Sequence, residues 1–459
     1  MVAGSMRMRG PRRRVSSRRR GLRGARVSAA VATHRRRPLV RMAAIAVAVT
    51  GMLALPGFTV PPSPSPSVSD PLRAMEYWLD DYGIRDAWQT STGAGVKIAI
   101  IDTGIGKGPA EFSGVVGGTD VSGLGSPDGR TPVGARDPDH GSWVASLAAS
   151  RGTSPDTGML GVAPDAELLS ISVGFGVSAS VPFTEQIAQA IYWAVDNGAD
   201  IINLSFTTNT PDWDRSWDDA FMYAFDHDVV VVAAAGNRAS GTGVVGAPAT
   251  IPGVLVVGGV DPRGRASLDA STQGITIAVA APSENLLGVS ADGTVVQWDG
   301  TSGAAPIVAG VAALVRSAYP DMDADDVINH IIRTATPPAG VTDLPDPLYG
   351  YGLVDAEAAV TASVPAVNEN PLGNLAEWIT IYRRANLIPD PQPTVPPAAV
   401  EPLPPVEQQA AGSPLLPSTD SLLYGTVPLT AATVAAILVA LGVTAAVRRI
   451  RLASRAPRR

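Results

Sequence analysis

The feature that most constrains the fold is an alternation of short apolar runs with amphipathic segments between residues 96 and 335. The runs consist mainly of Ile, Val, Leu and Ala, which is typical of strands buried on both faces of a parallel sheet. Between them, residues 185–197 place Ile187, Ile191 and Val195 on one face of a helix. This alternation predicts an α/β fold with a doubly wound, mainly parallel sheet. The predicted strands lie within residues 96–101, 161–174, 199–205, 229–235 and 251–260, and further helices at 218–225 and 323–335.

A stretch of small residues, Gly300-Thr301-Ser302-Gly303-Ala304-Ala305-Pro306, precedes the apolar run 307–315. Small neighbours let a peptide backbone come close, and a helix N-terminus directs free N–H groups and a positive dipole end at whatever lies there. That environment suits a serine nucleophile whose attack creates an oxyanion. Taken alone, the stretch is equally typical of a turn before a buried helix. Its interpretation therefore depends on residues elsewhere in the chain.

Three residues upstream could complete a nucleophilic site. Asp102 follows the first predicted strand, His140 opens a helix of small residues, and Asn237 follows the strand 229–235. A serine needs an imidazole to take its proton, and the imidazole needs a buried carboxylate to fix its tautomer. The amide of Asn237 is placed to donate to the oxyanion. A metal site at Asp137, Asp139 and His140 is the alternative, but no second cluster of His and Glu supports it.

Composition excludes several other classes of function. The chain has no cysteine, so it has no disulfide framework, no thiolate nucleophile and no Cys-ligated metal. Residues 1–41 and 448–459 hold 20 of the 35 basic residues and no acidic one, which leaves 15 basic against 42 acidic residues between them. The middle of the chain is therefore acidic and a poor candidate for binding nucleic acid.

Residues 1–60 combine an Arg-rich leader with an apolar run, the order that is typical of a secretory signal. The run is either cleaved near residues 54–65 or kept as an anchor, and a nucleic-acid-binding arm is the competing interpretation of the basic part. Residues 61–84 are expected to be a spacer and an N-terminal extension, with a short helix within 72–88 that packs on the main domain at 85–362.

The C-terminal part predicts a membrane anchor. Residues 363–426 are expected to be a Pro-rich linker without a core of its own. Residues 427–447 carry no charge and are long enough to cross a bilayer as one helix, although a buried helix of a soluble protein is the alternative. Because an Arg-rich tail follows at 448–459, we expect the C-terminus in the cytoplasm and the acidic body outside the cell membrane.

Four blocks of the sequence resemble the signature blocks of the subtilisin-like serine proteases, the subtilases. They are Ile101-Asp102-Thr103-Gly104, His140-Gly141-Ser142-Trp143-Val144-Ala145, Ala234-Ala235-Gly236-Asn237 and Gly300-Thr301-Ser302-Gly303-Ala304-Ala305-Pro306. The resemblance extends over residues 85–360. It implies that Asp102 orients His140, that His140 is the general base and then acid, and that Ser302 is the nucleophile that forms an acyl-enzyme. Asn237 and the backbone N–H of Ser302 would form the oxyanion hole.

The same resemblance implies where a polypeptide substrate binds. Main-chain pairing would involve two segments, and small residues would line the primary specificity pocket. A pocket with small walls favours an apolar or middle-sized P1 side chain, and Arg238 near its rim would disfavour a basic one. The implied substrate-binding residues are Ser172, Val173, Gly174, Ser205, Phe206, Thr207, Ala234, Ala235, Gly236 and Gly246.

The arrangement of domain, linker and C-terminal span is similar to that of the mycosins, membrane-anchored subtilases associated with type VII secretion in actinobacteria. The segment Glu76-Tyr77-Trp78-Leu79-Asp80 also resembles the extension that wraps the catalytic domain of mycosins. Two positions depart from the subtilase pattern. Ser142 stands where Thr is usual, and Gly303 stands where Met or an aromatic residue is common, which is expected to loosen the turn that carries Ser302.

Two functions remain open at this point. The first is an active, membrane-tethered serine endopeptidase, which the complete set of Asp, His, Ser and Asn favours. The second is a structural subunit of a secretion complex with weak or no proteolysis. The expected partners are a polypeptide substrate, the membrane and proteins of a secretion complex. No cofactor or catalytic metal is expected, and no ordered loop for structural calcium is evident.

Overall fold

The computed structural model describes residues 70–383 and 426–453. The chain divides into two compact units, residues 1–388 and 389–459, which are described separately. The predicted leader and signal at 1–60, residues 384–425 of the predicted linker, and the end of the tail from 454 lie outside the described residues.

The first unit is built on a seven-stranded sheet in the order β2-β3-β1-β4-β5-β6-β7, in which all neighbours are parallel. A separate antiparallel hairpin pairs β8 with β9. This confirms the predicted parallel sheet. The strands are β1 (Lys97–Asp102), β2 (Val115–Asp120), β3 (Glu167–Ser172), β4 (Ile201–Leu204), β5 (Val230–Ala234), β6 (Leu255–Val260), β7 (Val279–Pro282), β8 (Leu286–Val289) and β9 (Val295–Trp298).

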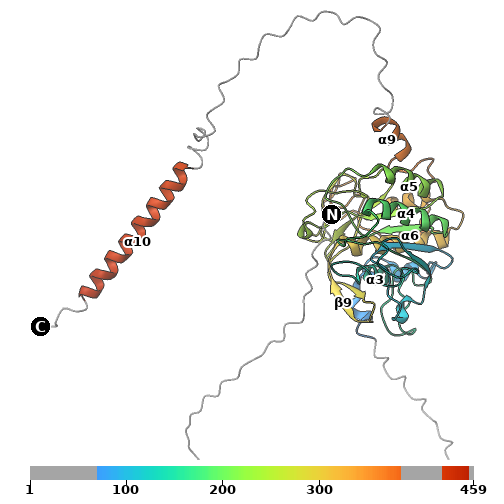
Figure 1. Cartoon of the computed structure of the whole chain (residues 1–459), viewed down its shortest axis with the longest axis horizontal. Coiled ribbons are helices and arrows are strands. Elements are labelled where there is room, and N and C mark those ends of the chain that lie inside the picture. Colours follow the sequence, from blue (N-terminus) through green and yellow to red (C-terminus); the bar gives the residue numbers. More distant parts are fainter. Residues whose placement is uncertain (1–69, 384–425, 454–459) are drawn as a thin grey trace, which may run out of the picture. The chain divides into compact units, whose positions relative to one another are not determined.

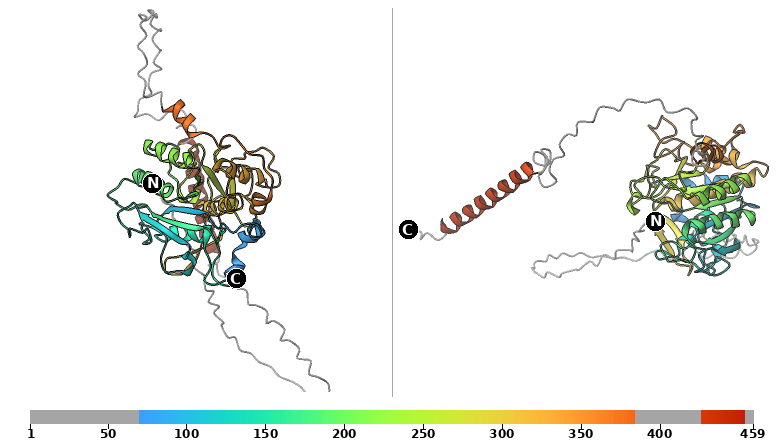
Figure 2. Two further views of the ribbon diagram at one scale, coloured as in Figure 1. Left: turned by 90° about the vertical axis from the view of Figure 1, so that its right-hand side faces the viewer. Right: turned by 45° about the horizontal axis from the view of Figure 1, so that its top comes forward.

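Helices cover both faces of the sheet (Figures 1 and 2), so the fold is doubly wound. One core lies between the sheet and α3, α6, α7 and α8, and the other lies between the sheet and α4 and α5. The main helices are α3 (His140–Ala149), α4 (Phe183–Asp196), α5 (Arg215–Asp226), α6 (Thr301–Ala318), α7 (Ala324–Thr334) and α8 (Ala356–Thr361). Helix α6 is buried along most of its length. It consists mainly of apolar and small residues, Ala, Val and Gly, which allow it to pack within the core on all sides.

The N-terminal extension packs on the main domain through α1 (Tyr77–Asp81) and α2 (Ile84–Ala87), after a 3₁₀ turn at Arg73–Met75. Trp78 and Ile84 are fully buried in the core. Glu76 is also fully buried, and one of its carboxylate oxygens accepts from Leu160 N at 2.6 Å. The extension is thus part of the folded domain.

The structure departs from the predicted start of the linker at residue 363. Helix α9 (Leu375–Tyr382) begins at Asn374, whose side chain caps it by accepting from the backbone N–H of Glu377. Beyond its end, the Arg383 guanidinium pairs with Asp218 of α5 at 2.7 Å and lies over the rings of Trp213 and Trp378. The Pro-rich segment therefore follows an ordered helix, α9, which Arg383 attaches to the domain.

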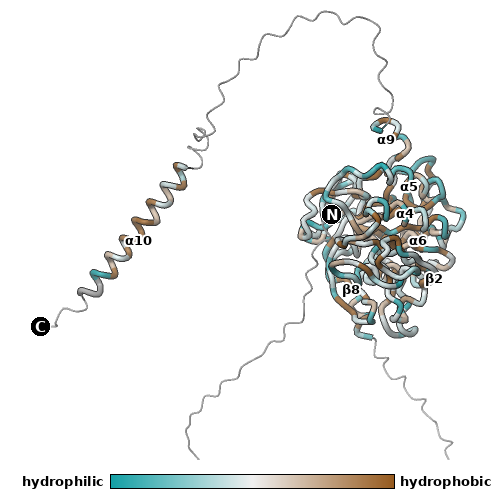
Figure 3. Tube along the Cα trace, in the orientation of Figure 1, coloured by the Kyte–Doolittle hydropathy of each residue, from teal (hydrophilic) through white to brown (hydrophobic). Residues whose placement is uncertain are grey.

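The described part of the second unit is one helix, α10 (Val427–Ala453). Its residues Val427–Arg449 are long and apolar enough to cross a membrane, and Figure 3 shows the apolar run giving way to polar residues near the end. Helix α6 also satisfies the length and composition criterion, but it is a core helix of the domain. The predicted span at 427–447 lies within α10.

Candidate active site

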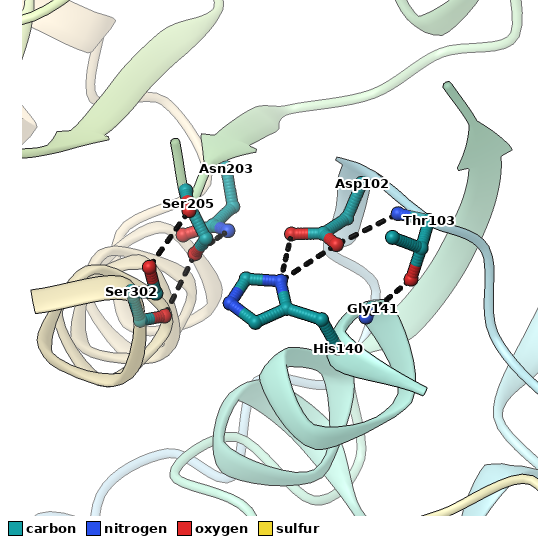
Figure 4. A network of polar contacts seen from close by, with 7 residues as sticks. All are labelled: Asp102, Thr103, His140, Gly141, Asn203, Ser205 and Ser302. Atoms are coloured by element: carbon teal, nitrogen blue, oxygen red, sulfur yellow. Dashed lines mark hydrogen bonds and ion pairs between the residues drawn. The ribbon is translucent and has the colours of Figure 1, made fainter. Parts of the chain in front are cut away.

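The carboxylate of Asp102 and the imidazole of His140 form a hydrogen-bonded pair (Figure 4). Asp102 is the last residue of β1, His140 is the first residue of α3, and Nδ1 lies 2.8 and 3.0 Å from the two carboxylate oxygens. Asp102 is 1% exposed and also accepts from Thr103 N at 2.7 Å. Thr103 Oγ1 in turn accepts from Gly141 N at 2.8 Å, which ties the end of the strand to the start of the helix.

This contact sets both the tautomer and the basicity of His140. Because Nδ1 faces a carboxylate, it carries the proton, and Nε2 is left as the acceptor. Burial by itself would lower the pKa of His140, but the charge and hydrogen bond of Asp102, with a contribution from Asp137, raise it above its ordinary value. The imidazole is therefore prepared to take a proton at Nε2, as a general base must.

Ser302 lies in the first turn of α6, where the sequence analysis expected it. Its Oγ donates to the carbonyl oxygen of Ser205 at 2.9 Å, and Ser205 Oγ donates to the carbonyl oxygen of Ser302 at 2.8 Å. Figure 4 shows Nε2 of His140 directed towards the side on which Ser302 lies. Among the hydrogen bonds of the described residues, none joins Ser302 Oγ to His140. The hydroxyl thus has to rotate before His140 can take its proton.

The side chain of Asn237 is held through its Oδ1, and its amide nitrogen makes no hydrogen bond within the described part of the chain. Its Oδ1 accepts from Thr301 N at 2.7 Å and from Thr301 Oγ1 at 2.9 Å, so the Nδ2 group points the other way. Thr301 Oγ1 also accepts from Gly236 N at 3.0 Å. Gly300 has φ 151° and ψ 152°, and a Cβ there would approach Asn237 Nδ2 to 3.0 Å, so this position requires glycine. The network brings Asn237 to the N-terminus of α6.

The substrate-binding residues implied by the resemblance differ in whether their backbone N–H groups already make hydrogen bonds within the protein. Val173 N already donates to Asp102 O at 2.7 Å, and Gly174 N donates to the side chain of Gln186 at 2.9 Å. Ser172 is fully buried at the end of β3. These three residues have little main chain to offer a peptide, so we expect pairing to use residues beyond Gly174.

In the second group of implied residues, one member contacts Ser302 and the others pack against their own neighbours. Ser205 contacts Ser302 directly, and Thr207 Oγ1 lies 3.1 Å from the carbonyl oxygen of Gly246. Phe206 packs with Phe175 and Phe183, at ring distances of 5.5 and 5.6 Å. The walls implied for the pocket are buried and small, namely Ala234, Ala235, Gly236 and Gly246.

Two tryptophan rings lie near the imidazole of His140, one from α3 and one from the β8–β9 hairpin. The rings of Trp143 and Trp298 lie 6.4 and 5.7 Å from the imidazole and 5.9 Å from each other. Trp298 comes from the hairpin strand β9 and packs near Gly303 of α6. The turn at Gly303 is not loosened, because Leu286 and Trp298 occupy the space where a side chain would lie.

Four polar residues at the site were missed by the sequence analysis: Thr103, Thr301, Asn203 and Gln186. Three of them had a visible signal in the sequence. Thr103 and Thr301 directly adjoin Asp102 and Ser302. Asn203 interrupts an apolar strand, which also marks it. Within residues 70–383 and 426–453, no group of three or more His, Cys, Asp or Glu could hold a metal ion.

Comparisons with known proteins agree with this geometry. The sequence profile of the subtilase family matches residues 93–352. Subtilisin DY of Bacillus licheniformis is 38% identical over 272 residues, which cover 58% of this chain and 91% of the relative. Mycosin-4 of Mycobacterium tuberculosis is 35% identical over 323 residues, 61% of this chain and 68% of the relative.

Solved structures of mycosins share the fold. The structure of MycP1 with the N-terminal propeptide removed has a TM-score of 0.54 and 30% identity, and it covers 64% of this chain and 98% of that one. The MycP3 protease from the type VII (ESX-3) secretion system has a TM-score of 0.53 and 33% identity, with 62% of this chain and 88% of that one covered.

Proposed function

The chain belongs to the subtilase family of serine endopeptidases, and we propose that it cleaves peptide bonds with Asp102, His140 and Ser302 as its catalytic triad. The observation that carries the proposal is the buried carboxylate–imidazole pair, which leaves Nε2 of His140 facing the start of α6. Such a pair prepares a nitrogen to accept the proton of a serine, which acyl transfer requires.

The reaction follows from these contacts. Ser302 Oγ rotates away from the carbonyl of Ser205, gives its proton to His140 Nε2 and forms a bond to the scissile carbonyl carbon. The carbonyl oxygen becomes an oxyanion, which accepts hydrogen bonds from Asn237 Nδ2 and Ser302 N. When the C–N bond breaks, the leaving amine takes the proton from His140, whose cation Asp102 has stabilised. Water then gives a proton to His140 Nε2 and forms a bond to the acyl carbon. The bond between that carbon and Ser302 Oγ breaks, Oγ takes the proton back from His140, and the carboxylic acid product leaves.

A fluorophosphonate probe tests this proposal directly, because it reacts only with an activated serine. The wild-type chain is expected to be labelled, and Ser302→Ala is expected to abolish labelling. Ser317→Ala is the matched control, since Ser317 lies at the other end of the same helix and its hydroxyl contacts Ala94 O. Absence of labelling in a folded wild-type preparation would refute the proposal.

One observation favours a second function, that of a structural subunit without proteolysis. The Ser302 hydroxyl donates its hydrogen bond to the carbonyl oxygen of Ser205 rather than to His140. If this contact were permanent, the chain would be an inert member of a secretion complex. The labelling experiment separates the two functions, because a permanent contact leaves Ser302 unreactive.

We further propose that α10 anchors the enzyme in a membrane, with the acidic domain outside and Arg448 and Arg449 in the cytoplasm. The mycosin relatives favour a role beside a type VII secretion system. Because the chain has no cysteine, single substitutions report topology cleanly. In intact cells, Thr294→Cys is expected to react with an impermeant maleimide and Ser454→Cys is not; the reverse pattern would contradict this orientation.

A further inference from the structure

The central strand β4 carries a buried amide that the catalytic steps do not use. Asn203 is fully buried and lies in register with Ile100 of β1 and Val232 of β5. Burying an amide in an apolar sheet is costly unless it makes hydrogen bonds. Its Nδ2 donates to Ser205 Oγ at 2.8 Å, whereas Oδ1 has no hydrogen-bond partner among the described residues. The bond to Ser205 is therefore the contact that offsets the burial.

This bond fixes the direction in which Ser205 donates. The amide NH₂ group is only a donor, so the hydroxyl oxygen of Ser205 must accept from Asn203. The single proton of Ser205 is then left for the carbonyl oxygen of Ser302, 2.8 Å away. Asn203 thus donates a hydrogen bond to Ser205, and Ser205 donates one to the backbone carbonyl of Ser302 (Figure 4).

The carbonyl at the end of this chain lacks its ordinary partner. In an α-helix the carbonyl of residue 302 accepts from the N–H of residue 306. Residue 306 of α6 is proline, which has no N–H. The Ser205 hydroxyl supplies the donor that Pro306 cannot, at the very residue that carries the nucleophile.

We propose that Asn203 and Ser205 are positioning residues that hold the backbone of Ser302 in place of the missing helical hydrogen bond. The inference rests on the proposed endopeptidase function. The two hydrogen bonds between Ser205 and Ser302 have different parts in it. The Ser302 Oγ contact breaks when the hydroxyl rotates towards His140, whereas the contact to Ser302 O persists and keeps the Cα fixed during that rotation.

The test measures the rate constant of inactivation, kinact, and the binding constant, KI, of a fluorophosphonate on the full-length chain in detergent. Displacement of a nucleophile by a fraction of an ångström lowers the rate of the chemical step, so we expect Ser205→Ala to lower kinact roughly 10-fold with KI unchanged. Ser205→Thr keeps the hydroxyl and should restore kinact. Asn203→Leu, which keeps the side chain's size but cannot orient Ser205, should lower kinact by a smaller factor.

A second background distinguishes positioning from a general loss of structure. Pro306→Ala restores an N–H that can bond to Ser302 O, so Ser205→Ala should lower kinact much less in that background. An equal loss in both backgrounds, a wild-type kinact in Ser205→Ala, or failure of Ser205→Thr to restore the rate would overturn the inference. If Ser205→Ala does not fold, a wild-type kinact in Asn203→Leu overturns it. An unlabelled wild-type chain would refute the proposed function itself.

Discussion

The glycine that follows the nucleophile offers a sharp test of the packing beneath the site. Gly303 lies in the first turn of α6, and a Cβ added there would overlap Leu286 Cδ1 of the β8–β9 hairpin. It would also approach Leu147 Cδ1 to 3.1 Å and Trp298 Cη2 to 3.2 Å. Leu286 is fully buried, so it has little room to move away. Gly303→Ala should therefore be destabilising although it lies in a helix.

Two opposing contributions to the free energy of unfolding set the size of the destabilisation by Gly303→Ala. Replacing Gly by Ala inside a helix stabilises it by about 1 kcal/mol. Forcing an extra carbon into a packed core costs about 1–3 kcal/mol, so a net destabilisation of roughly 1 kcal/mol is expected. Leu286→Ala alone should cost about 2–5 kcal/mol, but it removes the atom that the new Cβ would overlap. In that background Gly303→Ala should become stabilising by up to about 1 kcal/mol.

The measurement is the free energy of unfolding from urea titrations of the four variants in this cycle, followed by tryptophan fluorescence. Gly310→Ala is the matched control, because a Cβ there would meet Val162 instead of Leu286, so it should destabilise both backgrounds alike. The reasoning is refuted if Gly303→Ala has the same sign with Leu286 and with Ala at that position.

Three further predictions concern the catalytic groups and the extension. Asn237→Ala should lower kcat by about 10²–10³, the loss found on removing the corresponding donor in subtilisin, a relative of this chain; a loss below about tenfold would remove Asn237 from the oxyanion hole. Because Asp137 helps to raise the pKa of His140, the acid limb of kcat/KM should move to lower pH in Asp137→Asn, and an unmoved limb would contradict that coupling. Burial raises the pKa of Glu76 to about 7. The stability that protonated Glu76 contributes is therefore complete below the unfolded pKa of about 4.3 and is lost as pH rises to about 7. Because Gln does not titrate, Tm of the wild type should fall relative to that of Glu76→Gln over this range, and a constant difference between the two would contradict it.

The backbone of the site was predictable because its functional residues terminate periodic elements. Asp102 ends an apolar run, and His140 and Ser302 open helices of small residues, so local patterns placed them at the ends of elements; their combination and the resemblance to subtilases then singled them out. The polar residues that orient them were not predicted, although Thr103 and Thr301 lie next to them in the sequence. Their roles depend on hydrogen bonds between their hydroxyl groups and residues of other elements. The periodicity of a sequence does not indicate such contacts.

The elements that sequence reasoning missed are those without a clear period. The strands β8 and β9 are four residues each, too short for a pattern to distinguish from loop, yet they supply Leu286 and Trp298 to the site. Helix α9 lies next to Pro-rich sequence, and its attachment depends on contacts of Arg383 with Asp218 and Trp213, which are far away in the chain, and with Trp378 of α9 itself. Such contacts are set by tertiary structure, so composition alone placed this segment in a linker.

Strand order, which the sequence did not reveal, explains how the residues of the site come to lie side by side. Asp102 ends β1, and Ser205 and Asn237 follow β4 and β5; these three strands are direct neighbours in the sheet. Because neighbouring parallel strands share one register, a slip of one residue in β4 would turn Asn203 and Ser205 to the opposite face. The hydrogen bonds that these two residues send towards α6 therefore depend on the same register that aligns Asp102 with His140. The sheet thus fixes Asp102 and Ser205 together, and with Ser205 the contact that we propose holds the backbone of Ser302.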